Sequence, residues 1–133
     1  NISLPEEDKM INFAKKFIGV PYQYGGTGEG GFDCSGYTQF VLGNYGYSIP
    51  RSARTQKSAL KPVKIKNAEK GDLVFFSKNK SKKNITHVGI VISNPGEDLM
   101  MIHASSSRGI MITNITIDSY WSPKLVAVGR PTK

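Results

Sequence analysis

The chain has 133 residues, of which 38% are hydrophobic and 21% are charged, and its 18 Lys and Arg against 10 Asp and Glu give a formal net charge of +8. This composition is typical of a globular protein and excludes an intrinsically disordered chain. The length predicts a single domain over residues 1–133, which we expect to be monomeric. The positive charge predicts attraction to anionic partners, but nucleic acid is not expected, because no recognition helix, zinc-finger spacing or RNA-binding strand pattern occurs.

Membrane and export signals are missing from the sequence. No stretch approaches the ~20 apolar residues needed to span a membrane, and the opening NISLPEEDKM has no hydrophobic signal-peptide core. We therefore expect no transmembrane segment, and either a cytosolic protein or one whose leader has been removed. The single cysteine, Cys34, excludes an internal disulfide and leaves the redox compartment undetermined.

The first predicted element is an amphipathic helix. Ser3 is a candidate N-cap, Pro5 would lie in the first turn, and Glu6 follows three residues after Ser3 as a capping-box partner. Apolar residues then recur at helical spacing up to Phe17, before Gly19 ends the pattern.

A glycine-rich loop and a second helix follow. Residues 22–32 hold five of the 14 glycines, so we expect no regular element there. Asp33 is a good N-cap for a helix from about Cys34 to Asn44. Cys34 would then lie in the first turn, where free backbone N–H groups and the helix dipole are expected to lower the pKa of its thiol.

Short β-type segments dominate the rest of the chain. Turn-forming residues separate them, and the Pro95–Asp98 turn predicts that two neighbours form a hairpin. The short connections favour antiparallel pairing, so the sequence predicts an α+β fold, with N-terminal helices packed on a C-terminal antiparallel sheet of about five to six strands. The predicted strands are Val63–Ile65, Leu73–Phe76, His87–Ile92, Leu99–His103, Ile110–Ile115 and Leu125–Val128.

Two conspicuous segments are interpreted as loops. Residues 26–31, GTGEGG, match a dinucleotide-binding fingerprint, but they lack the preceding strand and the acidic residue about 20 positions later that this fold requires. The lysine-rich segment Lys78–Lys83 is interpreted as a solvated loop.

Cys34 and the two histidines are the candidate catalytic residues. A thiolate nucleophile needs a base that later protonates the leaving amine, and one imidazole can do both. His87 opens one predicted strand and His103 ends the next, so pairing of these strands would bring the two imidazoles together. Nucleophile, base and orienting residue would then follow in chain order. A Cys-His-His zinc site is the alternative, although no C-x-x-C or H-E-x-x-H pair supports it.

These motifs closely resemble the NlpC-type cell-wall peptidases of the papain-like superfamily. They occur in family order and extend over nearly the whole chain from Ile11 to Arg130. The matching segments are Gly19-Val-Pro-Tyr-Gln-Tyr-Gly-Gly26, Phe32-Asp-Cys-Ser-Gly36, Ile49-Pro-Arg-Ser52, Gly71-Asp-Leu-Val-Phe-Phe76, His87-Val-Gly-Ile90 and Ile102-His-Ala-Ser-Ser106.

The resemblance implies a papain-like fold and a cysteine endopeptidase that hydrolyses peptidoglycan stem peptides, typically between γ-linked D-glutamate and a diamino acid, through a thioester acyl-enzyme. It implies that Cys34 is the nucleophile, His87 the base and His103 the orienting residue, with no metal and no cofactor. Tyr22 matches a tyrosine that lines the cleft beside the nucleophile. Residues that hold the stem peptide, including in some members its free amino terminus, are matched by Asp33, Ser35 and Ser52.

The resemblance also implies an extracytoplasmic protein of the bacterial envelope whose partner is a stem peptide or muropeptide. Its positive charge would favour anionic envelope polymers. Two other functions remain open, namely a non-catalytic wall-binding module and an amidase or acyl transferase with the same fold. The diamino acid that is accepted is not determined by the sequence.

Overall fold

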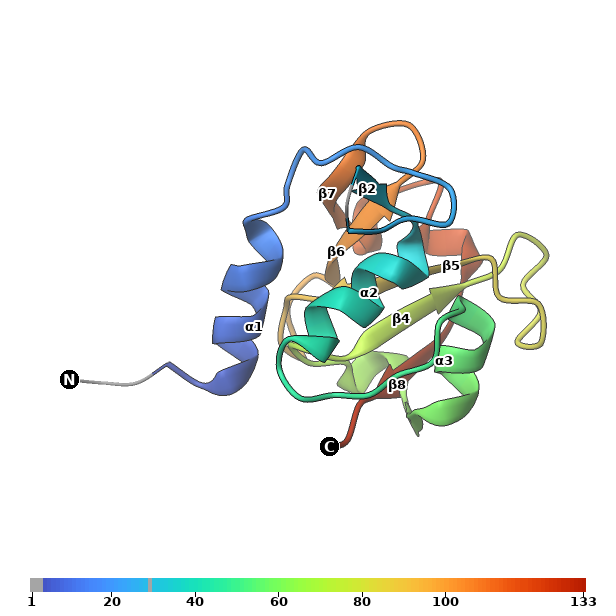
Figure 1. Cartoon of the computed structure of the whole chain (residues 1–133). Helices are drawn as coiled ribbons and strands as arrows, with labels where there is room; N and C mark the ends of the chain where they lie inside the picture. The colour runs from blue at the N-terminus through green and yellow to red at the C-terminus, as the bar shows by residue number, and fades with distance from the viewer. Residues whose placement is uncertain (1–3, 29) are drawn as a thin grey trace.

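The computed structural model describes residues 4–28 and 30–133 and shows three α-helices and a six-stranded antiparallel sheet within them (Figure 1). The α+β, papain-like fold is therefore confirmed. The strand order is β3-β8-β4-β5-β6-β7. The helices are α1 (Glu6–Lys15), α2 (Cys34–Gly43) and α3 (Ala53–Ala59), and the strands of this sheet are β3 (Lys61–Val63), β4 (Leu73–Phe76), β5 (His87–Val91), β6 (Met100–Ser105), β7 (Gly109–Asn114) and β8 (Leu125–Arg130).

The two N-terminal helices occur where their sequence patterns predict them, but the N-terminal cap of the first helix differs from the prediction. Helix α1 begins at Glu6 with Pro5 in the N-cap position, whereas the predicted cap, Ser3, lies outside the described residues. Helix α2 begins at Cys34 because the carboxylate of Asp33 accepts a hydrogen bond from the backbone N–H of Gly36 at 2.6 Å, as predicted for an N-cap.

Three local predictions differ from the structure. Helix α3 was not predicted, because its sequence ARTQKSA has no apolar periodicity; a capping box between Ser52 and Thr55 stabilises its start. The predicted strand Val63–Ile65 lies two residues earlier, and Ile65–Asn67 forms a 3₁₀ turn. The glycine-rich segment contains a small hairpin of β1 (Thr27–Gly28) and β2 (Gly31–Phe32) rather than only a loop.

The central strands are buried on both faces. Leu73 and Phe75 of β4 join the cluster under α1 and α2, whereas Val74 and Phe76 join a second cluster on the opposite face. This explains why the strand reads as a continuous apolar run instead of alternating. Burial of each large side chain contributes about 2 kcal/mol.

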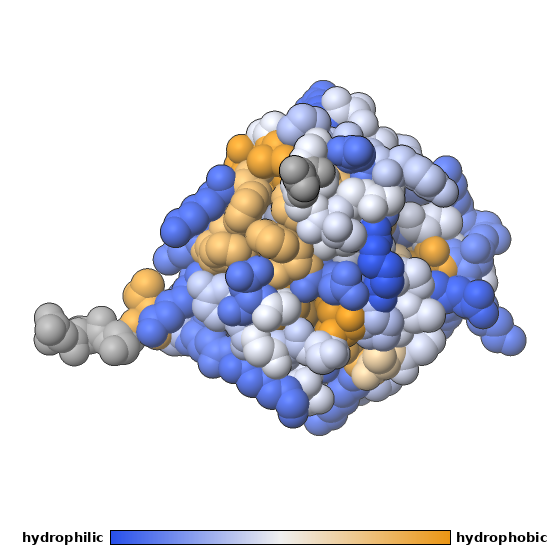
Figure 2. Space-filling model, in the orientation of Figure 1, coloured by the Kyte–Doolittle hydropathy of each residue, from blue (hydrophilic) through white to orange (hydrophobic). Residues whose placement is uncertain are grey.

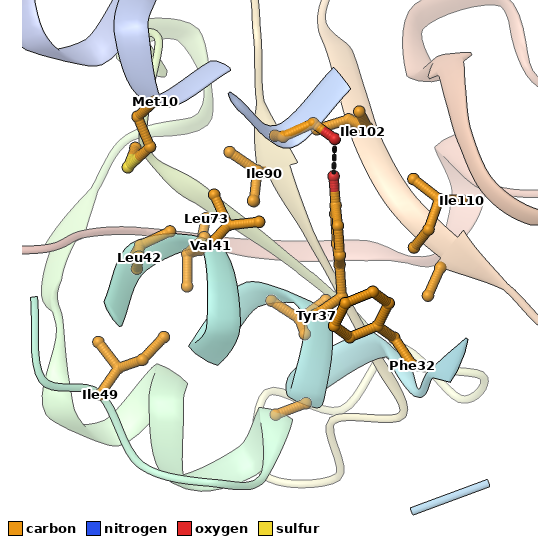
Figure 3. Close-up of a cluster of buried hydrophobic side chains, with 14 of the residues drawn as sticks. Met10, Phe32, Tyr37, Val41, Leu42, Ile49, Leu73, Ile90, Ile102 and Ile110 are labelled. Atoms are coloured by element: carbon orange, nitrogen blue, oxygen red, sulfur yellow. Dashed lines mark hydrogen bonds between the residues drawn. The ribbon is translucent and has the colours of Figure 1, made fainter. Parts of the chain in front are cut away.

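The two long helices are fixed over one face of the sheet. Figure 3 shows the buried side chain of Tyr37 in this core, where its hydroxyl donates a 2.7 Å hydrogen bond to the backbone carbonyl of Ala14 and so joins α2 to α1. Figure 2 shows apolar surface between these helices, where Phe13, Phe17 and Phe40 are only partly buried. Helix α2 packs against β5 and β6, which places its first residue, Cys34, near the start of β5 (Figure 1).

Candidate active site

Cys34 begins helix α2, and its position follows from local hydrogen bonds. Asp33 satisfies the N–H of Gly36, and the carbonyl of Asp33 accepts the N–H of Tyr37 at 3.0 Å. The N–H groups of Cys34 and Ser35 belong to the first helical turn, which has no intrahelical acceptors for them. Two backbone donors therefore lie beside a half-buried thiol.

The two histidines come together because β5 and β6 are neighbours. The turn that contains Pro95–Asp98 joins these strands, as predicted. The Nε2 atom of His87 lies 2.8 Å from Nδ1 of His103, within hydrogen-bond distance. His103 lies inside β6 rather than at its end, because the strand continues to Ser105. The contact leaves Nδ1 as the nitrogen of His87 that is free to act on a thiol.

The histidine pair is extended by a residue that sequence reasoning missed. Nε2 of His103 lies 2.9 Å from the hydroxyl oxygen of Thr113 on β7, and both side chains are buried. A threonine in a β-type segment is too common to have signalled this role. The hydroxyl can accept a hydrogen bond from the Nε2–H of His103 and so help to set its tautomer.

Trp121 was also missed, and it covers the histidine pair. Its ring stacks on that of His87 with centroids 4.4 Å apart and an interplanar angle of 28°, and it meets His103 edge-on at 5.4 Å. Asp118 fixes this loop by accepting hydrogen bonds from the backbone N–H groups of Tyr120 and Trp121 at 2.9 and 2.8 Å. The only signal in the sequence was a lone tryptophan in a polar segment.

Burial keeps the catalytic candidates neutral. It raises the pKa of the Cys34 thiol, although backbone N–H groups, chiefly that of Val88, act in the opposite direction. The predicted lowering of this pKa is therefore wrong, because desolvation outweighs the stabilising donors. Burial lowers the pKa of His87 well below 6.5, an effect that His103 reinforces, and it lowers the pKa of His103 to about 4.

Cys34 and His87 line one cleft of about 660 Å³ together with Tyr22. Burial raises the pKa of Tyr22, so its phenol remains a hydrogen-bond donor at neutral pH. The phenol lines the same cleft as the thiol, and its contact with substrate remains a prediction. The remaining lining residues are Lys78, Thr86, Ala104, Ser105, Ser106, Ser107, Arg108, Met111, Thr113, Asp118, Tyr120, Trp121 and Lys124.

Asp33 and Ser35 contact Arg51, to which sequence reasoning gave no role. The guanidinium of Arg51 donates to both carboxylate oxygens of Asp33, at 3.0 and 2.8 Å, and to the hydroxyl of Ser35 at 2.9 Å. Bidentate pairs of this kind are among the stronger charged hydrogen bonds. The Asp33 carboxylate is therefore neutralised by a partner within the protein.

Ser52 occupies a different environment from the other predicted binding residues. Its hydroxyl accepts the N–H of Thr55 at 3.2 Å and lies 2.6 Å from the Thr55 hydroxyl, which caps helix α3. Like Asp33 and Ser35, it is absent from the lining of the cleft that contains Cys34 and His87. The structure thus gives Ser52 a local structural role, and its contact with substrate remains a prediction.

The geometry does not favour the zinc alternative. A metal held between two imidazoles stands about 2 Å from each nitrogen, so the nitrogens would be farther apart than the 2.8 Å between His87 and His103. Over residues 4–28 and 30–133, no three His, Cys, Asp or Glu side chains form a group suited to a metal ion.

Over the same residues, no helix is long and apolar enough to cross a membrane.

The papain-like fold, with Cys34 and His87 in one cleft and His103 bonded to His87, is the arrangement expected of a cysteine-type hydrolase. The family model described as the NlpC/P60 family matches residues 19–130. The chain therefore belongs to the NlpC/P60 family, as its motifs predicted.

Known relatives agree with this assignment. The chain is 40% identical over 92% of its length to the bifunctional muramidase/DL-endopeptidase CwlT of Bacillus subtilis, and 35% identical over 90% to a gamma-D-glutamyl-L-lysine dipeptidyl-peptidase of Bacillus cereus. It spans 36% and 35% of those proteins, about a third of their length. The fold also matches a crystal structure of an NlpC/P60 family protein from Bacillus cereus, with a TM-score of 0.84 at 33% identity. This match covers 98% of the present chain and 41% of the Bacillus cereus chain.

Proposed function

We propose that the protein is a cysteine endopeptidase of peptidoglycan stem peptides, which hydrolyses the bond between γ-linked D-glutamate and a diamino acid. The observation that carries this proposal is the hydrogen bond between Nε2 of His87 and Nδ1 of His103, in a cleft shared with the thiol of Cys34. Thiol peptidases require a histidine base of which one ring nitrogen acts on the thiol while the other is held by a hydrogen-bond partner.

The proposed reaction begins from a neutral thiol and a neutral imidazole. Nδ1 of His87 takes the proton of Cys34, and the thiolate attacks the scissile carbonyl carbon. The backbone N–H groups of Cys34 and Ser35 are the donors available for the oxyanion. When the C–N bond breaks, the amine takes the proton from His87 and leaves a thioester on Cys34.

Water completes the cycle. His87 removes a proton from the attacking water, the C–S bond breaks, and the proton returns to sulfur as the acid product is released. Throughout, the N–H at Nε2 of His87 donates to Nδ1 of His103, which requires the proton of His103 at Nε2, directed at Thr113. Only this tautomer leaves Nδ1 of His87 unprotonated and able to act as base.

The substrate assignment is supported by the relatives, whose names specify DL-endopeptidase and gamma-D-glutamyl-L-lysine dipeptidyl-peptidase activities. In this proposal Tyr22, Asp33, Ser35 and Ser52 bind the stem peptide, with Arg51 holding the Asp33 carboxylate in place. Such a substrate implies an extracytoplasmic protein, a free muropeptide or wall stem peptide as partner, and no cofactor.

Digestion of purified muropeptides, followed by mass spectrometry, tests the proposal directly. We expect fragments ending in γ-D-glutamate and fragments beginning with the diamino acid. Cleavage only between the sugar and the stem peptide would favour an amidase, and binding without cleavage would favour a wall-binding module. Either result would overturn the proposed reaction.

A further inference from the structure

Cationic side chains from three separate segments surround the cleft. Lys78 lies in the turn after β4, Arg108 in the turn between β6 and β7, and Lys124 at the end of the last 3₁₀ turn, Ser122–Lys124. Asp118 is the one acidic residue among the described residues that line the cleft, and its Oδ1 already accepts two backbone N–H groups. The cleft lining therefore carries an excess of two positive charges.

Two of these cations have no counter-ion in the fold. Within residues 4–28 and 30–133, the side chains of Lys78 and Arg108 make neither an ion pair nor a hydrogen bond, and both are exposed. The ammonium of Lys124 donates to the carbonyl of Tyr120 at 2.9 Å and lies 3.8 Å from the centre of that ring. By contrast, Arg51 at the Asp33 side is fully paired.

The proposed reaction decides which part of the substrate meets these charges. The departing amine must receive its proton from His87, so the leaving segment lies on the His87 side of the thiol. His87 begins β5, and Lys78 follows one neighbouring strand, β4, while Arg108 follows the other, β6. Asp33 and Arg51 do not line this cleft. The leaving diamino acid therefore occupies the cationic part.

We propose that Lys78 and Arg108 select the leaving diamino acid by the charge of its side chain, and that the cleft prefers one that carries a carboxylate beside its ammonium, as in meso-diaminopimelate, over lysine. This inference rests on the proposed function. A lysine side chain ends in an ammonium alone and adds a positive charge to a cationic cleft. A diaminopimelate side chain is neutral overall and offers a carboxylate to the guanidinium of Arg108.

The expected preference is modest, because the charges are exposed to water. Exposed ion pairs contribute about 0.2–1 kcal/mol each, so two pairs correspond to a ratio of kcat/KM of about twofold to thirtyfold. Screening by salt should reduce this ratio, since the side chains lie at the surface.

Three synthetic tripeptides test the inference, each with L-alanyl-γ-D-glutamate followed by meso-diaminopimelate, by its side-chain amide or by L-lysine. The amide has the shape of diaminopimelate and the net charge of lysine, so it separates charge from fit. We expect kcat/KM for the free acid to exceed that for both others by about twofold to thirtyfold at low salt.

Two sets of variants test whether Lys78 and Arg108 cause the preference for the free acid. The double variant Lys78→Gln/Arg108→Gln should bring the ratio of free acid to amide close to one, whereas Lys66→Gln, which removes an exposed charge remote from the cleft lining, should leave it unchanged. Equal rates for acid and amide in the unmodified protein, or an unchanged ratio in the double variant, would overturn the inference alone. Hydrolysis of none of the three peptides would overturn the proposed function and the inference together.

Discussion

The two sides of the cleft are built in different ways. The thiol side is local: Asp33 caps its own helix through a residue three positions away, and Cys34 is the next residue along the chain. The imidazole side is assembled from distant segments, with hydrogen bonds across 16 and 10 residues and a tryptophan from the C-terminal part of the chain. Local hydrogen bonding thus positions the nucleophile, whereas sheet pairing positions the base.

The largest effect is expected at the thiol. Cys34→Ala and Cys34→Ser should eliminate turnover and leave the fold intact, because the thiolate forms the covalent bond and small residues fit the first helical turn. Turnover of muropeptide and circular dichroism would be measured on the same preparations. Wild-type hydrolysis by purified Cys34→Ala would falsify the nucleophile assignment.

On the imidazole side, the two histidines should differ in their effects. His87→Ala removes the proton carrier and should reduce kcat by about 10²–10⁴-fold. His103→Ala should cost less, and His103→Asn less still, because an amide oxygen can accept the hydrogen bond from His87.

Melting temperature distinguishes catalysis from packing in these variants. If His103 only fills space beside Met101 and Ile102, its replacements would lower the melting temperature without changing turnover. Unchanged turnover in folded His103→Ala would therefore remove this residue from the catalytic set.

Variants of Trp121 test whether the ring that covers the His87 imidazole contributes to catalysis. Trp121→Ala should admit water to His87, raise its pKa towards 6.5 and reduce kcat by roughly tenfold, because the ring orients and desolvates the base. Trp121→Phe, which keeps an aromatic cover, serves as the matched control and should lie between. NMR titration of His87 and steady-state kinetics would measure both, and a wild-type pKa in Trp121→Ala would contradict this role.

Stability should fall as the pH falls from about 6.5 to about 4. The folded pKa of His103 is about 4, below its usual 6.5, so the unfolded chain binds more protons in this window and acid favours unfolding. The shift of the His103 pKa lowers the free energy of unfolding by about 3 kcal/mol once protonation is complete. Calorimetry between pH 7.5 and 4 should show a lower melting temperature at acid pH and a smaller decrease in His103→Asn; equal decreases in both proteins would argue against His103.

The smallest expected effect is that of metal removal. Thiol and imidazole chemistry needs no ion, so dialysis against a chelator should leave turnover unchanged. Activity lost to the chelator and restored by zinc would replace the thiol mechanism with a metal-dependent one.

The sequence by itself determined those features that depend on neighbouring residues. The cap at Asp33, the start of α2 at Cys34, the apolar strands from Leu73 onward and the β5–β6 hairpin were predicted and confirmed, because each depends on spacing within a few residues. The family was determined in the same way, through short motifs in a fixed order. Helix α3 escaped prediction because capping by Ser52 and Thr55, without an apolar period, starts it.

Only the tertiary structure decided the environment of the reacting groups. The sequence indicated a lowered pKa for Cys34, but burial reverses the direction. Neither Thr113 behind His103 nor Trp121 over His87 could be foreseen, because both contacts depend on how distant segments meet across the sheet. Desolvation and long-range hydrogen bonds arise only when the chain is folded, so spacing in the sequence does not specify them.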